Sequence, residues 1–237
     1  MKTGTLYLIP TNLSAPFTPA HILPATVVET ALRLNHYVAE NAKVARAFLK
    51  NIGLDKPLLE ISIRELNNHT RIDALAEMIA PLVAGHDVGL VSEAGAPGVA
   101  DPGAIIVALA HQHGIAVVPL VGPSSILLGL MASGLNGQKF AFHGYLPQDK
   151  AIRINVLIEL ENESRRRNMT QLFIETPYRN HSLYADLLTT LSPSTQLCVA
   201  RDLTGNREYV QTKRIAEWRK LVPTTEKLPT LFLLLAK

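Results

Sequence analysis

Short runs of hydrophobic residues alternate with longer segments in which hydrophobic positions recur every three or four residues. The short runs predict buried strands, and the periodic segments predict helices. In the first half of the chain the two kinds of segment follow one another regularly, which is typical of a mostly parallel sheet with helices on both faces. The predicted strands are Thr5–Pro10, His36–Ala39, Leu58–Ile63, Asp87–Val91 and Ile115–Leu120, and the predicted helices are Ala25–Leu34, Asn41–Asn51, Arg71–Ala84 and Ala104–Ala110.

Three prolines interrupt the segment Thr11–Pro24, which therefore predicts an irregular loop after the first strand. In the second half of the chain, strands often follow strands directly, and this predicts a more mixed sheet. Its predicted strands are Phe140–Leu146, Leu172–Ile174, Leu197–Ala200, Glu208–Gln211 and Thr230–Ala236, and its predicted helices are Ile126–Ala132, Ile154–Arg167, Ser182–Leu191 and Ile215–Leu221.

The fold class predicted from these patterns is α/β, with two α/β domains at residues 1–120 and 121–237. The first contains the mostly parallel sheet with flanking helices, and the second contains the mixed sheet. Within the second domain, Ile126–Ala132 is apolar nearly all round, which predicts a helix buried on both sides.

A loop rich in glycine and proline stands between a predicted strand and a predicted helix. It reads V-S-E-A-G-A-P-G-V-A-D-P-G from Val91 to Gly103. Asp101 followed by Pro102 predicts the helix start, because an Asp carboxylate caps free N–H groups and Pro suits the first turn. In an open α/β sheet such a loop lies at the carboxyl end of a strand, where ligands bind. The pattern alone gives equal weight to a ligand-binding loop and to a structural turn.

Composition narrows the class of protein. Of the 237 residues, 47% are hydrophobic and 18% charged, which predicts a sizeable core. No apolar run reaches the length of a membrane span or of a signal-peptide core, and we expect a cytoplasmic protein. The single cysteine, Cys198, lies in an apolar run and is interpreted as a core residue. The histidines are too scattered for a metal site, and the formal charge of +3 permits a polyanionic partner without requiring one.

Two polar groupings allow alternative interpretations. The run Arg165–Arg167 suits RNA contact, but cations at a helix C-terminus also suit the helix dipole, and we favour the second interpretation. Glu175 and Arg179 are four residues apart, a spacing that lets their side chains meet. Thr176 is predicted to cap the helix that follows. For Glu175, contact with a cationic ligand and a structural ion pair have nearly even weight, and we predict the ligand contact.

Five ordered motifs identify a resemblance that spans nearly the whole chain. Ser92–Gly103, S-E-A-G-A-P-G-V-A-D-P-G, closely resembles the S-D-A-G-x-P-x-x-S/N-D-P-G signature of the bacterial 16S ribosomal RNA cytidine 2′-O-methyltransferases, the small-subunit methyltransferase I family. This family belongs to the tetrapyrrole methylase superfamily of S-adenosylmethionine (SAM) methyltransferases. The other matching segments are V-P-L-V-G-P-S-S at 118–125 with A-S-G-L at 132–135, F-A-F-H-G-Y-L-P at 140–147, F-I-E-T-P-Y-R at 173–179 and A-R-D-L-T-G-N-R-E at 200–208.

The resemblance implies two α/β domains with SAM in the cleft between them, usually in a homodimer. It implies in-line transfer of the SAM methyl group to a ribose 2′-hydroxyl of small-subunit ribosomal RNA. It also assigns residues. Cofactor contacts are expected from Pro10, Glu93, Ala94, Gly95, Ala96, Val99, Gly122, Ser124, Ser125, Ile126 and Glu175, substrate contacts from Lys43, Arg46 and Arg179, a catalytic role for Glu40, and no metal ion.

The chain departs from the family pattern mainly in its N-terminal half. The family's T-P-I-G-N-L is here T-N-L-S-A-P at 11–16, and the family's A-E-D-T-R is here A-E-N-A-K at 39–43. Lys43 cannot reproduce the planar fork of an arginine. Two alternatives therefore stay open beside an RNA methyltransferase. One is a small-molecule methylase of the same superfamily, and the other is a SAM-binding relative without catalytic activity.

Overall fold

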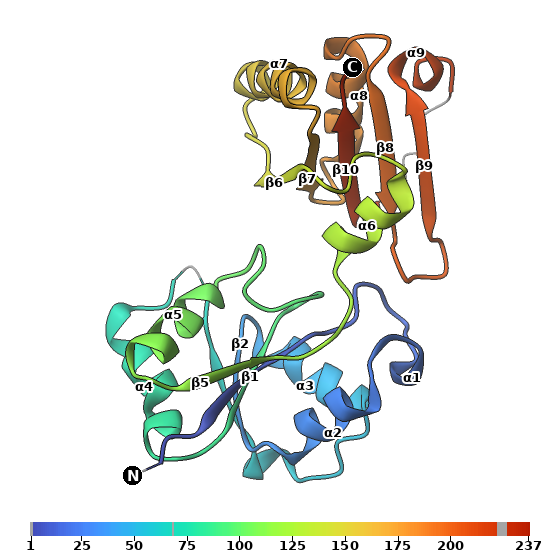
Figure 1. Cartoon of the computed structure of the whole chain (residues 1–237). Coiled ribbons are helices and arrows are strands. Elements are labelled where there is room, and N and C mark those ends of the chain that lie inside the picture. Colours follow the sequence, from blue (N-terminus) through green and yellow to red (C-terminus); the bar gives the residue numbers. More distant parts are fainter. Residues whose placement is uncertain (1, 68, 222–226) are drawn as a thin grey trace. The chain divides into compact units, whose positions relative to one another are not determined.

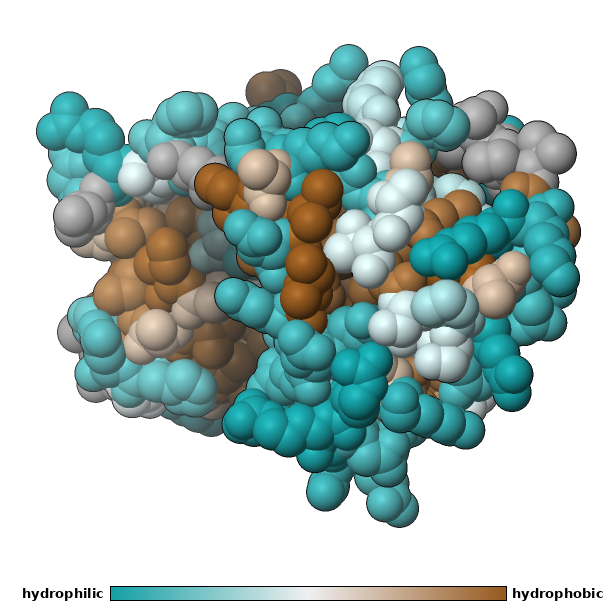
Figure 2. All heavy atoms as spheres, turned by 90° about the horizontal axis from the view of Figure 1, so that it is seen from above, coloured by the Kyte–Doolittle hydropathy of each residue, from teal (hydrophilic) through white to brown (hydrophobic). Residues whose placement is uncertain are grey.

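The computed structural model describes residues 2–67, 69–221 and 227–237. The chain divides into two compact units, Met1–Ser124 and Ser125–Lys237, each built on its own sheet (Figure 1). The α/β class and the change from a parallel to a mixed sheet are confirmed. Apolar side chains also reach the surface in places, between the hydrophilic residues that cover much of the face seen in Figure 2.

The first unit contains a parallel sheet of five described strands in the order β3-β2-β4-β1-β5. Helices α2 and α3 cover one face of this sheet, and α4 and α5 cover the other. Strand residues alternate between the two faces as a buried strand requires: Tyr37 and Ala39 face α2 and α3, whereas Val38 faces α4 and α5. The elements are β1 Thr5–Ile9, α1 Pro19–Ile22, α2 Ala25–Arg33, β2 His36–Ala39, α3 Ala42–Asn51, the 3-10 helix η1 Leu58–Glu60, β3 Ser62–Glu65, α4 Ile72–Val83, β4 Val88–Val91, α5 Ala104–Gln112 and β5 Ala116–Pro119.

The second unit contains a mixed sheet of five described strands in the order β6-β7-β10-β8-β9, in which only β6 and β7 are parallel. Helices α7, α8 and α9 share a core with one face of the sheet, and α6 contacts β10, β9 and β8. Cys198 is fully buried in β8, as predicted. The elements are α6 Ser125–Ser133, β6 Phe140–Tyr145, α7 Lys150–Arg167, β7 Thr170–Glu175, α8 Asn180–Thr190, β8 Gln196–Arg201, β9 Tyr209–Arg214, α9 Ile215–Trp218 and β10 Thr230–Leu235.

The prediction of a strand at Leu58–Ile63 is wrong in position. Leu58–Glu60 forms a 3-10 turn and Leu59 is 99% exposed, whereas β3 begins at Ser62, where it pairs with His36 of β2. Pairing with β2 therefore sets the limits of β3, although the apolar residues lie earlier in the chain. The predicted loop Thr11–Pro24 similarly contains the short helix α1.

Helix α6 is not buried on both sides as predicted. Gly129 and Leu130 are buried, but Leu127 is 53% and Met131 is 78% exposed. A Cβ on Gly129 would lie 2.4 Å from Leu231 Cδ2, so the absence of a side chain lets α6 approach β10 closely. Although α6 is apolar nearly all round, only one of its faces is buried.

Two further helices begin earlier than predicted, and two predicted caps are wrong. The Asp149 carboxylate accepts from Ile152 N at 3.0 Å, and α7 begins at Lys150 because of this cap, four residues before the prediction. Thr176 does not cap α8 with its side chain, and the helix begins at Asn180. Helix α5 begins at Ala104 as its predicted segment does, but Asp101 does not cap it as predicted.

Candidate functional site

The carboxyl ends of all five strands of the first sheet lie at one edge, because the strands are parallel. Pro10 follows β1, Glu40 follows β2, and Ser92 follows β4. Gly122 comes three residues after the end of β5. The structure thus brings the predicted residues of the first unit to one edge from four separate parts of the sequence.

Strands β1 and β4 are neighbours, and their following connections leave toward opposite faces of the sheet. The chain after β1 runs to α2, which packs with Ile9 on one face, and the chain after β4 runs to α5, which packs with Leu6 on the other. In open α/β sheets, such a reversal between adjacent strands marks the ligand-binding position. The candidate site is therefore the edge between Pro10–Thr11 and Ser92–Gly95.

Hydrogen bonds hold the two loops of this edge together. Thr11 N donates to Gly95 O at 3.0 Å, and Ser92 Oγ donates to the same oxygen at 2.7 Å. Thr11 Oγ1 also donates to Ser92 O at 3.4 Å. Gly95 has a φ of +77°, a conformation that side-chain-bearing residues avoid. The backbone of Gly95 is consequently fixed at the edge, next to the exposed residues Glu93 and Ala94.

The rest of the glycine loop is closed by Asp101. Its Oδ1 accepts from Gly98 N at 2.8 Å and from Gly103 N at 2.7 Å, so the carboxylate joins the two ends of a tight turn instead of capping α5. Ala96 is half-buried before this turn, and Val99 is 48% exposed within it. The turn places Val99 at the surface of the candidate edge.

Gly122 lies against the ring of Pro10. A Cβ on Gly122 would stand 2.2 Å from Pro10 Cγ, so a side chain there would collide with the end of β1. The sequence predicts that a ligand approaches this glycine closely, whereas the structure finds a close approach of Pro10. Cofactor contact by either residue stays a prediction. Ser124 precedes α6, Ser125 begins it and Ile126 lies in its first turn, and all three are half-buried.

Acidic groups give this edge a negative potential. Burial raises the pKa of the Glu40 carboxyl, and repulsion from Glu93 and Asp101 raises it further. Glu40, which follows β2, is therefore close enough to be repelled by the carboxylates of Glu93 and Asp101, which both follow β4. An edge of this kind attracts a cationic ligand.

Replacing Glu40 with Gln should stabilise the fold at pH 7 while weakening the binding of a cationic ligand about two- to fivefold, at most roughly 1 kcal/mol for one half-buried charge. Because the pKa of Glu40 is raised in the folded state, the protein loses stability as pH rises from the unfolded pKa through the folded pKa. At pH 7 the folded protein bears the full cost of the ionised carboxylate, and Gln removes this cost. Thermal unfolding at pH 4 and pH 7 measures the first effect. The gain should vanish at pH 4, and a gain of equal size at both values would contradict this account.

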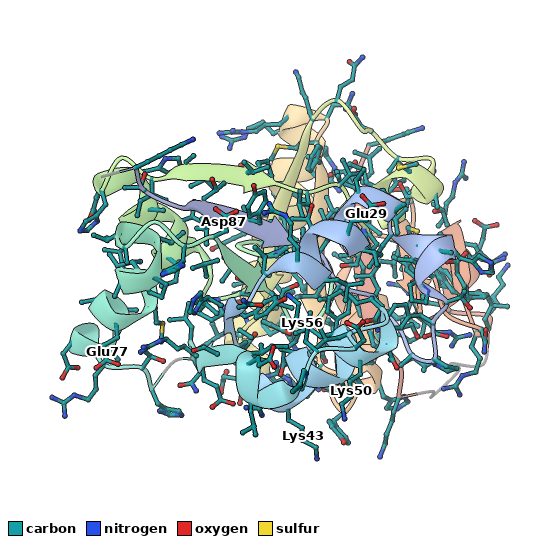
Figure 3. All side chains as sticks on the ribbon, turned by 90° about the horizontal axis from the view of Figure 1, so that it is seen from below. Glu29, Lys43, Lys50, Lys56, Glu77 and Asp87 are labelled. Carbon is teal, nitrogen blue, oxygen red and sulfur yellow. The ribbon has the colours of Figure 1, made fainter. Side chains whose placement is uncertain are left out.

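Helix α3, which follows Glu40, presents a row of cations. Asn41 caps the helix by accepting from Lys43 N at 2.9 Å and Val44 N at 3.2 Å. Lys43, Arg46 and Lys50 are exposed, and Lys43 and Lys50 lie on the outer side of the helix (Figure 3). Sequence reasoning missed Lys50, although its spacing of seven residues from Lys43 places the two on one face.

In the second unit, the predicted residues Glu175 and Arg179 form an ion pair. Glu175 Oε1 accepts from Arg179 Nε at 2.9 Å and Nη2 at 2.6 Å, and from Thr176 N at 2.6 Å. The Glu175 side chain is only 1% exposed. This geometry favours a structural brace at the turn between β7 and α8, and the ligand contact stays a prediction.

Substituting Glu175 with Gln should lower the thermal midpoint, because the Arg179 guanidinium would lose its charged partner. Hydrogen bonds to charged groups contribute about 1.5–3 kcal/mol, and we expect a loss in this range. The folded variant should bind SAM with unchanged affinity in a calorimetric titration. Weaker binding at an unchanged midpoint would instead support the ligand contact predicted from the sequence.

Three buried polar atoms of the second unit have no hydrogen-bond partner among the described residues: Arg179 Nη1 and Asn180 Oδ1 at this turn, and Thr204 Oγ1 after β8. Thr204 also has a φ of +67°, which is unusual for a residue with a side chain. Both features are typical of functional sites. Sequence reasoning did not select Asn180 or Thr204, but Thr204 belongs to the A-R-D-L-T-G-N-R-E motif and Asn180 directly follows F-I-E-T-P-Y-R.

Within the described ranges, no group of three or more His, Cys, Asp or Glu side chains could hold a metal ion. None of the helices in the same ranges is long and apolar enough to cross a membrane.

Comparisons with known proteins agree with the motifs. No model of a known protein family matches the chain. The chain is 31% identical over 222 residues to the ribosomal RNA small subunit methyltransferase I of Buchnera aphidicola, covering 92% of this chain and 73% of that protein. It is 33% identical over 207 residues to the protein of the same name from Synechocystis, covering 86% and 69%. For the Xylella fastidiosa protein of that name the identity is 35% over 189 residues, covering 79% and 66%.

Among solved structures, the methyltransferase CobJ superposes with a TM-score of 0.63, covering 99% of this chain and 95% of CobJ. The two sequences are only 17% identical, so this likeness shows a shared fold.

Proposed function

The chain belongs to the ribosomal RNA small subunit methyltransferase I family, and from this we propose that it is a SAM-dependent methyltransferase acting on RNA of the small ribosomal subunit. The observation that carries the proposal is identity above 30% over most of the chain and of its relatives. The finer proposal, a ribose 2′-hydroxyl as acceptor, rests on the resemblance of Ser92–Gly103 to the family signature. Such an enzyme would work in the cytoplasm.

The residues at the edge of the first sheet fit SAM. The carboxylates of Glu40, Glu93 and Asp101 suit a cationic sulfonium. Hydrogen bonds from Thr11 N and Ser92 Oγ fix the Gly95 carbonyl at this edge, where backbone groups could contact the ligand. SAM bound here would supply an activated methyl group for transfer to an oxygen nucleophile. We assign the cofactor contacts of this unit to Pro10, Glu93, Ala94, Gly95, Ala96, Val99 and Gly122.

Glu40 is our candidate for accepting the proton of the acceptor hydroxyl. Its raised pKa makes the carboxylate a stronger base than an ordinary glutamate, and its position directly after β2 puts it at the same edge. The cations of α3 begin three residues later, at Lys43. One end of this edge thus combines a base with groups that attract phosphates.

Two measurements test the function. Calorimetric titration with SAM measures cofactor binding, and methyl transfer from labelled SAM to small ribosomal subunits that lack the modification measures activity. We expect binding and transfer to one ribose. Binding without transfer would identify a non-catalytic relative, and transfer only to small tetrapyrrole-type acceptors would identify a small-molecule methylase. Sedimentation equilibrium tests the homodimer that the resemblance implies.

Neutralising Lys43 and Arg46 together should weaken RNA binding about tenfold at low salt. If both side chains contact phosphates of single-stranded RNA, their loss lowers the slope of log K against log salt by about 1.4. Binding of a labelled rRNA fragment to Lys43→Ala/Arg46→Ala at several salt concentrations measures the slope. An unaltered slope in a folded variant would assign these residues to an ordinary solvated helix face.

A further inference from the structure

Basic residues are divided unevenly between the two units. Residues 125–237 contain 15 Lys and Arg against ten Asp and Glu, whereas residues 1–124 contain eight against ten. The positive charge of the chain therefore belongs to the second unit, and the charge of the first unit is slightly negative. A polyanionic substrate meets its main electrostatic attraction on the second unit.

Many of these cations gather at one end of the second sheet. Strand β9 leads into α9 and β10 leads to the end of the chain at this same end (Figure 1). Two arginines from different helices meet here at the end of α8. Arg219 Nη2 donates to Leu191 O at 3.0 Å, and Arg165 Nη2 donates to the next residue, Ser192 Oγ, at 3.5 Å. We call this surface the basic end, and its members are Arg165, Arg166, Arg167, Arg214, Arg219 and Lys220, all exposed.

Acidic groups neutralise only part of the basic end. Glu163 pairs with Arg167 at 3.4 Å, and Glu161 lies 3.8 Å from Arg165. The Glu161 carboxylate is buried and also accepts from Ser192 N at 2.8 Å. In the part of the chain that the structure describes, no carboxylate forms an ion pair with Arg166 or Lys220.

Helix dipoles do not account for all of these cations. The basic end collects the C-termini of α7, α8 and α9, and each helix end carries about half a negative charge. Glu161, Glu163 and Glu217 add three carboxylates. The six positive charges exceed the combined negative charge of the three helix ends and the three carboxylates. The surface therefore keeps a net positive charge that helix capping does not require.

We propose that the basic end docks the phosphate backbone of the RNA substrate, away from the edge of this sheet that holds Glu175. The two ends are separated by the length of β8, from Gln196 to Arg201, which is about 17 Å at the rise of an extended strand. An extended polyanion of several nucleotides reaches both ends, whereas one nucleotide does not. The inference rests on the proposed function and extends it by naming the surface that holds the RNA.

Arg166→Gln/Lys220→Gln tests the inference, because both side chains are exposed and neither forms a described ion pair. Lys2→Gln/Arg71→Gln is the control, since it removes two exposed cations from the first unit, although Arg71 pairs with Asp73 at 3.1 Å. The probes are protein-free small-subunit rRNA and intact small subunits lacking the modification. For the first variant we expect about tenfold weaker rRNA binding at 0.1 M salt and a salt slope lower by about 1.4. SAM affinity should stay at the wild-type value in both variants.

An unchanged salt slope in Arg166→Gln/Lys220→Gln would overturn the inference, and so would an equal loss in the control. Weaker binding to subunits with normal binding to protein-free rRNA would also overturn it, because the surface would then contact a ribosomal protein. The proposed function fails separately, if the wild-type protein neither binds SAM nor methylates the subunit.

Discussion

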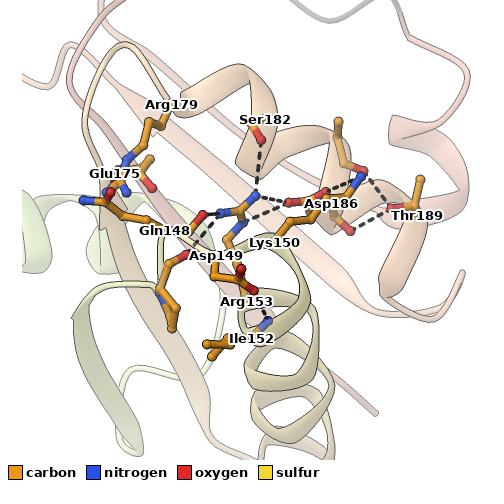
Figure 4. Close-up of polar contacts among 12 residues, drawn as sticks. Gln148, Asp149, Lys150, Ile152, Arg153, Glu175, Arg179, Ser182, Asp186 and Thr189 are labelled. Carbon is orange, nitrogen blue, oxygen red and sulfur yellow. Dashed lines mark hydrogen bonds and ion pairs between the residues drawn. The ribbon is translucent and has the colours of Figure 1, made fainter.

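Replacing Arg153 with Ala should destabilise the second unit by about 3–5 kcal/mol, the largest effect that we expect from a single substitution. Arg153 lies near the start of α7 and is buried together with Asp186 of α8. Its Nε donates to Asp186 Oδ2 at 2.8 Å and its Nη1 donates to Gln148 O at 2.8 Å, while Nη2 reaches Ser182 Oγ at 3.2 Å (Figure 4). Removing the guanidinium leaves the Asp186 charge buried, with Lys150 at 3.8 Å as its remaining ion-pair partner among the described residues.

Trp218 is the single tryptophan of the chain and lies buried in the second unit, so its fluorescence reports the unfolding of that unit in urea. The midpoint of thermal unfolding should fall by roughly 10–20 °C. Lys150→Ala is the matched control, because Lys150 lies on the same helix and is 72% exposed, and exposed ion pairs contribute about 0–1 kcal/mol. Equal losses for Arg153→Ala and Lys150→Ala would show that burial of the pair is not the cause.

Replacing Gly95 with Val should weaken SAM binding at least tenfold, roughly 1.4 kcal/mol. Gly95 has a φ of +77°, which costs a branched L-residue about 1–2 kcal/mol. The added Cβ would stand 3.0 Å from Leu13 Cδ2 and 3.4 Å from Pro123 O. The loop must therefore shift at the point where Thr11 and Ser92 hold it, and the shift would displace the backbone that we assign to the cofactor.

Gly114→Val provides the control for backbone strain. Gly114 has a φ of +63° and lies before β5, at the opposite edge of the same sheet. A Cβ added to Gly114 would have no neighbouring atom within 4 Å. We expect both variants to lose stability, but only Gly95→Val to lose SAM affinity by calorimetry. Normal SAM affinity in a folded Gly95→Val protein would remove Gly95 from the cofactor site.

Local patterns were sufficient to predict most elements of the fold. The strands β1, β2, β4 and β10 and the helices α2, α3 and α4 lie within one or two residues of their predicted limits. Each has an apolar run or a helical period whose meaning does not depend on distant residues. The change from a parallel to a mixed sheet was predicted for the same reason, since connection types appear in the order of elements along the chain.

The limits of β3 and the exposure of α6 could not be predicted locally. Which residues of 58–65 form a strand depends on pairing with His36–Ala39, and which face of α6 is buried depends on β10 and β8. The contact between Gly122 and Pro10 is of the same kind, because 112 residues separate the two in sequence. A hydrophobic pattern shows which residues can be buried. These three features depend instead on contacts with residues that are distant in the sequence.

For the site, the family motifs, the glycine loop and the charged residues that flank it can all be identified along the chain. The adjacency of β1 and β4, the bond from Thr11 to Gly95, and the repulsion of Glu40 by Glu93 and Asp101 are known only once the chain is folded. The unpaired polar atoms of Asn180 and Thr204 also belong to the folded chain, since no spacing in the sequence indicates them. Hydrogen bonding, burial and charge repulsion act through distances in space, and the parallel sheet brings residues from distant parts of the chain to a single edge.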